Sequence, residues 1–263
     1  MTSNPFQKTS RLTIQAAAKE GQTILTDVSF TAPFKIMQPF PKPDGSLQVM
    51  LLAASAGIME GDRQDFSFEI GSGARLEFLS QSYDKIHQME EGMAKRDTRI
   101  TVAPHGSFRF NPQPTIPFRD SAFENRMEIH LADETSVFQM SEIFSCGRYA
   151  HGEAFSYRFY HNLAEIRRGG VLIYRDNTRY EPALFDLAGL GMYEGYTHLL
   201  SLFLTRPEEP EAFQANVRSL LDSNSDIRGG ITRLASGDFV VRALGFRAQR
   251  LEELKEEIFV LAL

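Results

Sequence analysis

The sequence predicts a mainly β fold, a body of many short strands with two helices near the C-terminus. Strand-length segments, apolar or alternating, recur at short spacing with turn residues between them. Helical patterns are not interleaved with these segments, which argues against a parallel sheet built from βαβ units. The chain also contains 21 Phe and 8 Tyr but no Trp, and aromatic side chains of this kind suit pleated sheets.

The predicted strands follow one another along the first 205 residues. They are expected at 12–16, 23–31, 34–40, 47–54, 65–70, 74–80, 99–102, 107–110, 122–131, 137–144, 155–163, 171–174 and 197–205, with 83–87 as a further candidate. The clearest is 65–70, where Phe66, Phe68 and Ile70 alternate with polar residues at period two. Three prolines within 111–117 exclude a helix there and predict an edge strand or an ordered loop.

The last part of the chain changes character. Residues 207–211 combine two prolines with acidic residues, which is typical of the first turn of a helix, and an apolar stripe continues from Phe213 to Leu221. Segments 231–234 and 239–244 predict a hairpin, and 249–261 predicts a second helix with its own apolar stripe. We expect both stripes to pack on the sheet, because core packing is the commoner role of an amphipathic helix.

Length and composition favour one globular domain spanning 1–263. Hydrophobic residues make up 42% and charged residues 24%, and no repeat or composition shift marks a boundary. The net charge of −6, without a basic cluster, argues against a nucleic-acid partner. Met1 to Phe6 contain no apolar signal region and no segment is long enough to cross a bilayer, so we expect a cytoplasmic protein with no membrane partner.

The usual catalytic and cofactor motifs are missing from the sequence. Gly71-Ser72-Gly73 lacks the lysine and the following helix of a phosphate-binding loop, and no Gly-x-Ser-x-Gly elbow is present. The six histidines form no His-x-His or His-Glu-x-x-His pattern, and the single cysteine, Cys146, excludes an internal disulfide and a cysteine-cluster metal site. We therefore expect no enzyme activity, no catalytic residues and no tightly bound cofactor.

Three aspartates at turns or strand ends are the candidate site residues: Asp62, Asp84 and Asp176. Their hard carboxylate oxygens are suited to weak binding of a divalent cation. Each also fits an ordinary turn residue whose carboxylate accepts a bond from its own backbone. Two acids also fit a glycosidase, so a cytosolic β-sandwich carbohydrate-active enzyme using Asp62 and Asp176 is the alternative. A cupin-like metalloenzyme is disfavoured, because paired histidines on one strand are missing.

A series of short motifs, in order over about residues 12–244, resembles the urease accessory protein family UreD, also called UreH. The motifs are Pro33-Phe34-Lys35, Gln38-Pro39-Phe40, Leu51-Leu52-Ala53, Gly57-Ile58-Met59-Glu60-Gly61-Asp62, Ser80-Gln81-Ser82-Tyr83-Asp84-Lys85-Ile86-His87, Phe110-Asn111-Pro112, Ile116-Pro117-Phe118, Ser141-Glu142-Ile143, Gly147-Arg148, Tyr174-Arg175-Asp176-Asn177-Thr178 and Gly195-Tyr196-Thr197-His198. Their order and spacing, rather than any one motif, make the match specific.

The resemblance implies a non-enzymatic scaffold, a chaperone of metallocentre assembly. Such a protein binds apo-urease together with UreF and the GTPase UreG, and it assists nickel delivery through an internal tunnel lined partly by acids. It also implies a two-layer, β-helix-like body. Asp62 matches a Gly-Asp position of the family, Asp176 matches an acidic position after one gap, and Asp84 falls where the family varies. All three are expected to bind nickel weakly in transit.

Overall fold

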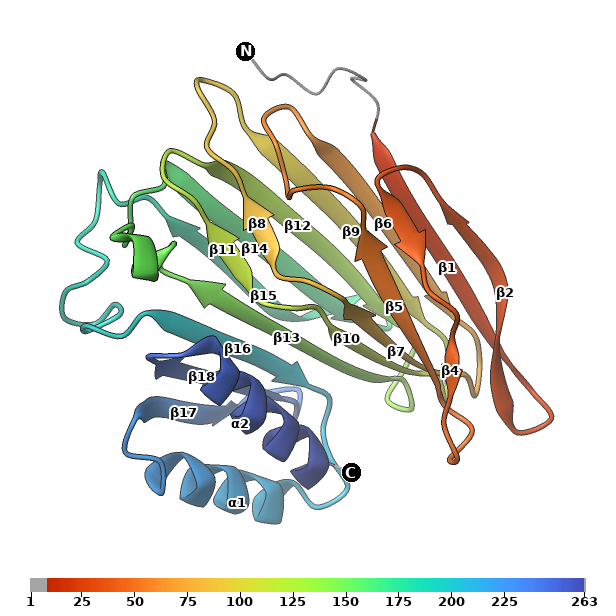
Figure 1. The fold of residues 1–263 in the computed structure, drawn as a ribbon. Coiled ribbons are helices and arrows are strands. Elements are labelled where there is room, and N and C mark those ends of the chain that lie inside the picture. Colours follow the sequence, from red (N-terminus) through yellow and green to blue (C-terminus); the bar gives the residue numbers. More distant parts are fainter. Residues whose placement is uncertain (1–8, 263) are drawn as a thin grey trace.

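The computed structural model describes residues 9–262. These residues form two β-sheets and two α-helices, and the second helix is the last element of the chain (Figure 1). The strands are β1 (Ser10–Lys19), β2 (Gln22–Phe30), β3 (Phe34–Ile36), β4 (Phe40–Pro41), β5 (Leu47–Ala53), β6 (Arg63–Ile70), β7 (Arg75–Ser80), β8 (Asp84–Ile86), β9 (Ala94–Val102), β10 (Ser107–Asn111), β11 (Thr115–Pro117), β12 (Ala122–Leu131), β13 (Val137–Ser145), β14 (Phe159–Arg168), β15 (Val171–Tyr180), β16 (His198–Leu204), β17 (Ile227–Arg233) and β18 (Phe239–Gly245). The helices are α1 (Pro210–Asp222) and α2 (Ala248–Leu261), and the 3₁₀ helix η1 spans Tyr149–His151.

The strands form two layers that face each other across one core. The first sheet has the order β15-β14-β12-β9-β6-β1-β2. The second has the main order β17-β18-β16-β13-β10-β7-β5-β3, with β4, β8 and β11 paired beside this path. The mainly β prediction and the two-layer arrangement are confirmed.

From β5 to β14 the chain passes back and forth between the layers, as in a β-helix, with the short β8 and β11 following β7 and β10 in the second sheet. Within the first sheet β1, β6, β9, β12 and β14 are parallel neighbours, and within the second β5, β7, β10 and β13 are. Parallel neighbours cannot be joined by a tight turn, so each connection needs a long crossover. Here a strand of the opposite sheet supplies that crossover, which explains how parallel sheets form without interleaved helices.

The core between the layers is rich in phenylalanine. Phe68 of the first sheet lies 5.0 Å from Phe78 and 5.1 Å from Phe108 of the second, measured between ring centroids. All three side chains are almost completely buried. Aromatic pairs at such distances stabilise a core beyond the area they bury.

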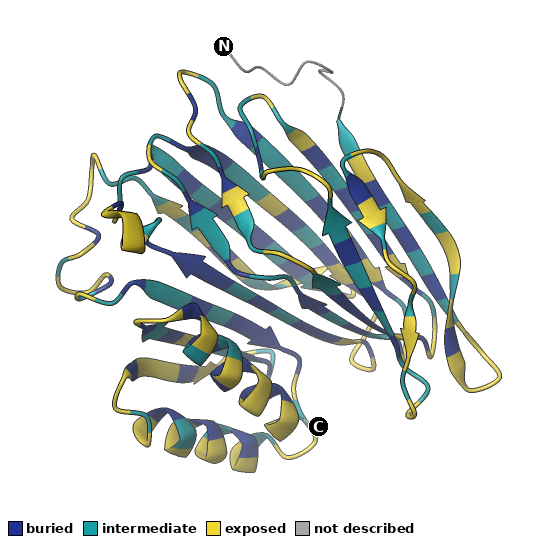
Figure 2. Ribbon diagram, in the orientation of Figure 1, coloured by how far each residue is buried: buried dark blue, intermediate teal, exposed yellow. Residues whose placement is uncertain are grey.

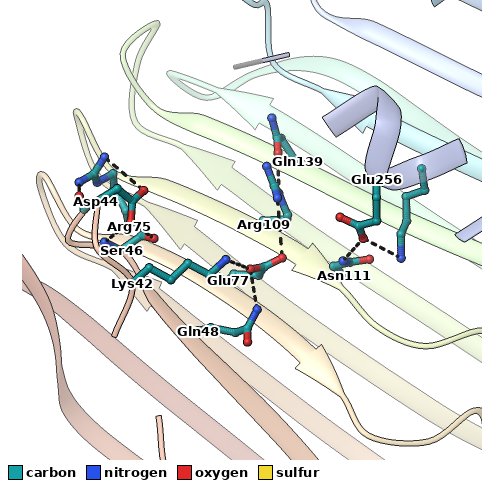
Figure 3. A network of polar contacts seen from close by, with 11 residues as sticks. Lys42, Asp44, Ser46, Gln48, Arg75, Glu77, Arg109, Asn111, Gln139 and Glu256 are labelled. Atoms are coloured by element: carbon teal, nitrogen blue, oxygen red, sulfur yellow. Dashed lines mark hydrogen bonds and ion pairs between the residues drawn. The ribbon is translucent and has the colours of Figure 1, made fainter. Parts of the chain in front are cut away.

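The outer face of the second sheet carries an in-register polar row (Figure 3). Gln48, Glu77, Arg109 and Gln139 are successive register partners on β5, β7, β10 and β13. Gln48 donates to Glu77 over 2.9 Å, Arg109 donates to Gln139 over 2.8 Å, and Lys42 reaches Glu77 at 2.5 Å. Lys42 and the Gln48 amide lower the pKa of Glu77 against the opposing effect of burial. The row ties neighbouring parallel strands together on the side away from the core.

Both helices pack on the outer face of the second sheet, α1 on β17 and α2 on β13, β16 and β18 (Figures 1 and 2). The stripe of α1 buries Phe213, Val217 and Leu221, and that of α2 buries Leu251 and Ile258, among other side chains. Figure 2 shows the opposite faces of both helices exposed. The expectation that the stripes serve the core is confirmed. Neither described helix has the length and apolar content that crossing a bilayer requires.

Several boundaries differ from the expected ones. The strand expected at 155–163 is β14, which begins only at Phe159, because Phe155 has a left-handed backbone (φ 50°) that interrupts an extended chain. The segment 34–40 splits into β3 and β4, and 171–174 extends into the ten-residue β15. The single domain spanning 1–263 stays a prediction. The cytoplasmic location was inferred partly from residues 1–6, which lie outside the described residues.

Candidate functional site

A polar rung crosses the inner face of the first sheet, where apolar side chains would be expected. Gln64, Arg96, Asn125 and Asn162 are successive register partners on β6, β9, β12 and β14. Arg96 donates to Gln64 over 2.8 Å, and Asn125 donates to Asn162 over 2.8 Å. Each residue occupies the inward position of an alternating strand, so the regular β pattern places the four side chains in one line. These two hydrogen bonds satisfy part of the rung, which lowers the cost of burying its polar groups.

Glu142 meets this polar rung from the second sheet. It occupies the inward position of β13 after Phe138 and Met140, and its carboxylate accepts hydrogen bonds from the Tyr160 hydroxyl and, over 2.9 Å, from the Asn162 amide. Burial raises the pKa of Glu142 to about 7, the bond from Tyr160 opposes that rise, and the nearby negative charge of Asp176 adds to it. The carboxyl group therefore exchanges a proton near neutral pH.

Asp84 pairs with an arginine at one end of the polar rung. Its carboxylate lies 2.6 Å from Nη1 of Arg96, and both side chains are largely buried. Arg96 also lies 5.0 Å from the centre of the Phe66 ring. The ion pair thus connects β8, at the border of the second sheet, to the polar rung of the first.

Asp176 pairs with another arginine beyond the other end of the polar rung. It is 9% exposed and accepts hydrogen bonds from Nη2 of Arg242 over 2.7 Å and from the Thr178 hydroxyl over 2.5 Å. The Arg242 side chain, on β18, is 49% exposed. A half-exposed guanidinium therefore covers a buried carboxylate.

Asp62 lies apart from these groups, at the turn before β6. Its carboxylate accepts a 2.8 Å hydrogen bond from the backbone N–H of Met59, and its own N–H donates to the Met59 carbonyl over 3.1 Å. This is the bonding expected of a turn aspartate. The two acids of the carbohydrate-enzyme alternative, Asp62 and Asp176, line no common cavity among those found in the described residues.

Four hollows adjoin one another in a row through this part of the protein. The loop cavity, about 70 Å³, lies beneath the loops at 55–57 and 80–85. The central cavity, about 40 Å³, lies between the sheets beside the polar rung, and the neck cavity, about 10 Å³, lies between β14, β15 and β16. The outer hollow, about 610 Å³, is bordered by β15, β17 and the loop that contains Gly191.

Neighbouring hollows share lining residues. The loop cavity and the central cavity share Asp84 and Arg96, and the central and neck cavities share Glu142 and Asp176. Arg242 lines both the neck cavity and the outer hollow. The row of hollows therefore leads past three carboxylates in turn, and two of them, Asp84 and Asp176, were singled out from the sequence.

The central cavity also contains buried polar atoms without a partner. The Thr98 hydroxyl and the Asn125 carbonyl oxygen are both buried and make no hydrogen bond to protein, and Thr98 is only 2% exposed. Unsatisfied buried groups next to a cavity are typical of sites that hold water or a small polar ligand. Within residues 9–262 no three His, Cys, Asp or Glu side chains gather closely enough to hold a metal ion, so the arrangement does not form a compact metal centre.

Sequence reasoning did not find Glu142, Arg96 or Arg242 as site residues. Glu142 belongs to the quoted motif Ser141-Glu142-Ile143, within the expected strand 137–144, where most neighbours are apolar. A charged residue in such a stretch was the available signal, since an isolated buried charge is costly and needs partners.

Comparisons with known proteins agree over nearly the whole chain. The family model described as UreD urease accessory protein matches residues 8–262. The chain is 39% identical over 252 residues to the urease accessory protein UreD of Acetivibrio thermocellus, covering 95% of this chain and 96% of that one. It is 35% identical over 257 residues to the urease accessory protein UreH of Helicobacter pylori strain P12, covering 97% and 95%. It is 33% identical over 245 residues to UreD of Flavobacterium johnsoniae, covering 92% and 88%.

Proposed function

The chain belongs to the UreD family of urease accessory proteins, and from this premise we propose that it binds apo-urease together with UreF and the GTPase UreG and guides nickel to the urease active site. Nickel is cargo in this proposal, carried through the protein without a resident cofactor. The chain acts as a chaperone of metallocentre assembly in the cytoplasm and has no turnover of its own. Steady hydrolysis of a glycan that Asp62→Asn abolishes would contradict that last point.

The row of adjoining hollows is the observation that carries the proposal. Asp84, Glu142 and Asp176 line it in order, and all three offer the hard oxygen ligands that a divalent cation accepts. The neck cavity is about 10 Å³, close to the roughly 10–15 Å³ that a single water requires. A hydrated nickel ion would therefore exchange water for side-chain oxygens as it passes. Asp62, at the turn before β6, is a weaker candidate for the same path.

Exposed apolar side chains support the assembly with other proteins. The loop between β15 and β16 exposes Leu184, Phe185 and Leu190 at 68%, 49% and 95%, and Phe246 after β18 is 54% exposed. Exposed apolar residues that gather in one region are typical of protein interfaces. This loop also contributes to the outer hollow, at one end of the proposed path.

A bulky substitution in the neck cavity tests the proposed nickel route. Ser201 lines both the central and the neck cavities, so Ser201→Leu places added carbon atoms where the ion would pass. We expect the variant to co-purify with UreF, UreG and apo-urease and to lower nickel content and urease activity after activation with GTP and nickel. Ser201→Ala, which removes the hydroxyl without adding bulk, should activate urease like the wild type.

Overpacking costs about 1–3 kcal/mol, so thermal midpoints and complex yields must be measured for both variants. Full activation by a folded, complex-forming Ser201→Leu would show that nickel takes another route. Failure of the wild-type chain to bind UreF or apo-urease would overturn the scaffold role itself.

A further inference from the structure

The neck cavity and the outer hollow meet at one charged side chain. Arg242 extends from β18 to Asp176, with 2.7 Å between Nη2 and Oδ2, and it lines the hollows on both sides. Its side chain is 49% exposed, whereas Asp176 is 9% exposed. The guanidinium therefore enters from the solvent side and ends on a buried carboxylate.

We propose that Arg242 is the gate of the cation path: its guanidinium occupies the place at Asp176 that a divalent cation would take, and it closes the neck until it moves into the outer hollow. This inference rests on the proposed function, because it concerns the same path. It adds a residue that controls entry and that discriminates on charge.

Competition for one carboxylate is the physical reason. A cation that enters the neck while Arg242 stays there meets a like charge at close range, where low effective dielectric strengthens the repulsion. The cation also finds Asp176 already hydrogen-bonded, by Arg242 and by Thr178. Removing the guanidinium leaves a buried carboxylate whose charge favours a replacement cation.

The outer hollow has space for the displaced side chain. At about 610 Å³ it is far larger than the neck cavity. It is also bordered by Glu194, which now pairs with Arg228 at 2.5 Å. An acidic group at this position, from Glu194 or from a bound partner, would hold the Arg242 guanidinium away from Asp176.

Nickel quenching of tyrosine emission tests the gate. The chain has no Trp, and Tyr160 and Tyr180 both line the neck cavity, so the intrinsic emission includes reporters at the site. We expect Arg242→Gln to lower the nickel concentration for half-quenching by about tenfold or more, since contacts between charged groups commonly contribute that much. Arg179→Gln is the matched control: Arg179 lines the same outer hollow but not the neck, and it pairs with Glu181 rather than Glu194, so this variant should bind nickel like the wild type.

A double variant shows whether the cation binds at the predicted carboxylate. Arg242→Gln combined with Asp176→Asn should titrate as weakly as the wild type, because it removes the carboxylate that the single variant exposes. If Arg242→Gln does not fold, Arg242→Lys is used in its place. Lys retains the charge on a smaller head group, so we expect the nickel concentration for half-quenching to fall by about threefold. Overlapping curves for the wild type and the Arg242 variant would overturn the gate, as would equal tightness of the single and double variants.

Different results would contradict the Arg242 gate and the nickel route through the neck cavity. If Ser201→Leu blocks urease activation while the Arg242 variant titrates like the wild type, nickel uses the path but Arg242 does not control it. If the Arg242 variant binds nickel more tightly while Ser201→Leu activates urease fully, the gate is correct and the route to urease lies elsewhere.

Discussion

Glu142→Gln tests the electrostatics of the interior directly. The pKa of Glu142 is raised from 4.5 to about 7, mainly by burial. Because the folded protein holds the proton more tightly than the unfolded chain, this group binds more protons in the folded state between these two values. Its contribution to stability is therefore complete below about pH 4.5 and is lost as the pH rises through about 7.

The size of the effect follows from the shift. Each unit of pKa corresponds to about 1.36 kcal/mol, so ionisation of Glu142 costs at most about 3 kcal/mol at pH 8. The figure is an upper value because Glu142 borders a cavity that can admit water. Glutamine stays neutral and fits the same contacts: its oxygen can accept from Asn162 and its amide can donate to the Tyr160 hydroxyl.

Urea unfolding of both proteins between about pH 5 and pH 8 measures the difference. We expect similar stability of wild type and Glu142→Gln at the acidic end, and a variant more stable by about 2–3 kcal/mol at the basic end. Glu124→Gln, on the outer face of β12, controls for the loss of one negative charge. A stability difference that does not change with pH would refute the reasoning, because it would place the ionisation of Glu142 outside this range.

Two further variants test contacts of residues that line none of the four hollows. Asp62→Ala should lower the free energy of unfolding by about 0.5–2 kcal/mol, because the Met59 N–H loses its acceptor. Asp62→Asn keeps an acceptor oxygen and should change the free energy of unfolding little. Poor nickel loading by an intact complex of the Asp62→Asn variant would instead support a role for Asp62 in nickel transit. Asp238→Ala should cost about 3–5 kcal/mol in urea unfolding, since it leaves the buried Arg168 guanidinium, now 2.8 Å from Asp238, without this partner. A loss below about 1 kcal/mol would show that water replaces the carboxylate.

The strands were predictable where one face alone is apolar. The segment 122–131 alternates over its whole length, and β12 (Ala122–Leu131) has the expected bounds. Alternation misled at 155–158, because Phe155 has a left-handed backbone and its ring packs on Tyr193 at 4.9 Å. Periodicity shows which side chains alternate along a segment. It does not show that one residue, here Phe155, has a left-handed backbone that interrupts the strand.

The polar rung was not predictable from the same patterns. Its members stand about 30 residues apart in sequence, one per strand, and each alone fits a half-exposed position. Only the register of the parallel strands aligns Gln64, Arg96, Asn125 and Asn162, and register is set by the packing of the whole sheet. Asp84 and Asp176 were found because each belongs to a family motif. Asp84 begins β8 as expected, but Asp176, expected at a turn or strand end, lies in the middle of β15. Their arginine partners, Arg96 and Arg242, could not be found in this way.

The pairing of these acids bears on what kind of cation site they can make. Asp84 and Asp176 are each neutralised by an arginine, and Glu142 holds a proton over much of the neutral range. A cation entering the interior must therefore displace an arginine or a proton at every carboxylate it meets. The free energy of that displacement offsets part of the electrostatic attraction between the cation and the carboxylate. If the proposed path carries nickel, this competition predicts weak binding, even though three acids line the row of hollows. A site that stored nickel would instead need unpaired ligands gathered at one point, and within the described residues the carboxylates stand apart along a row.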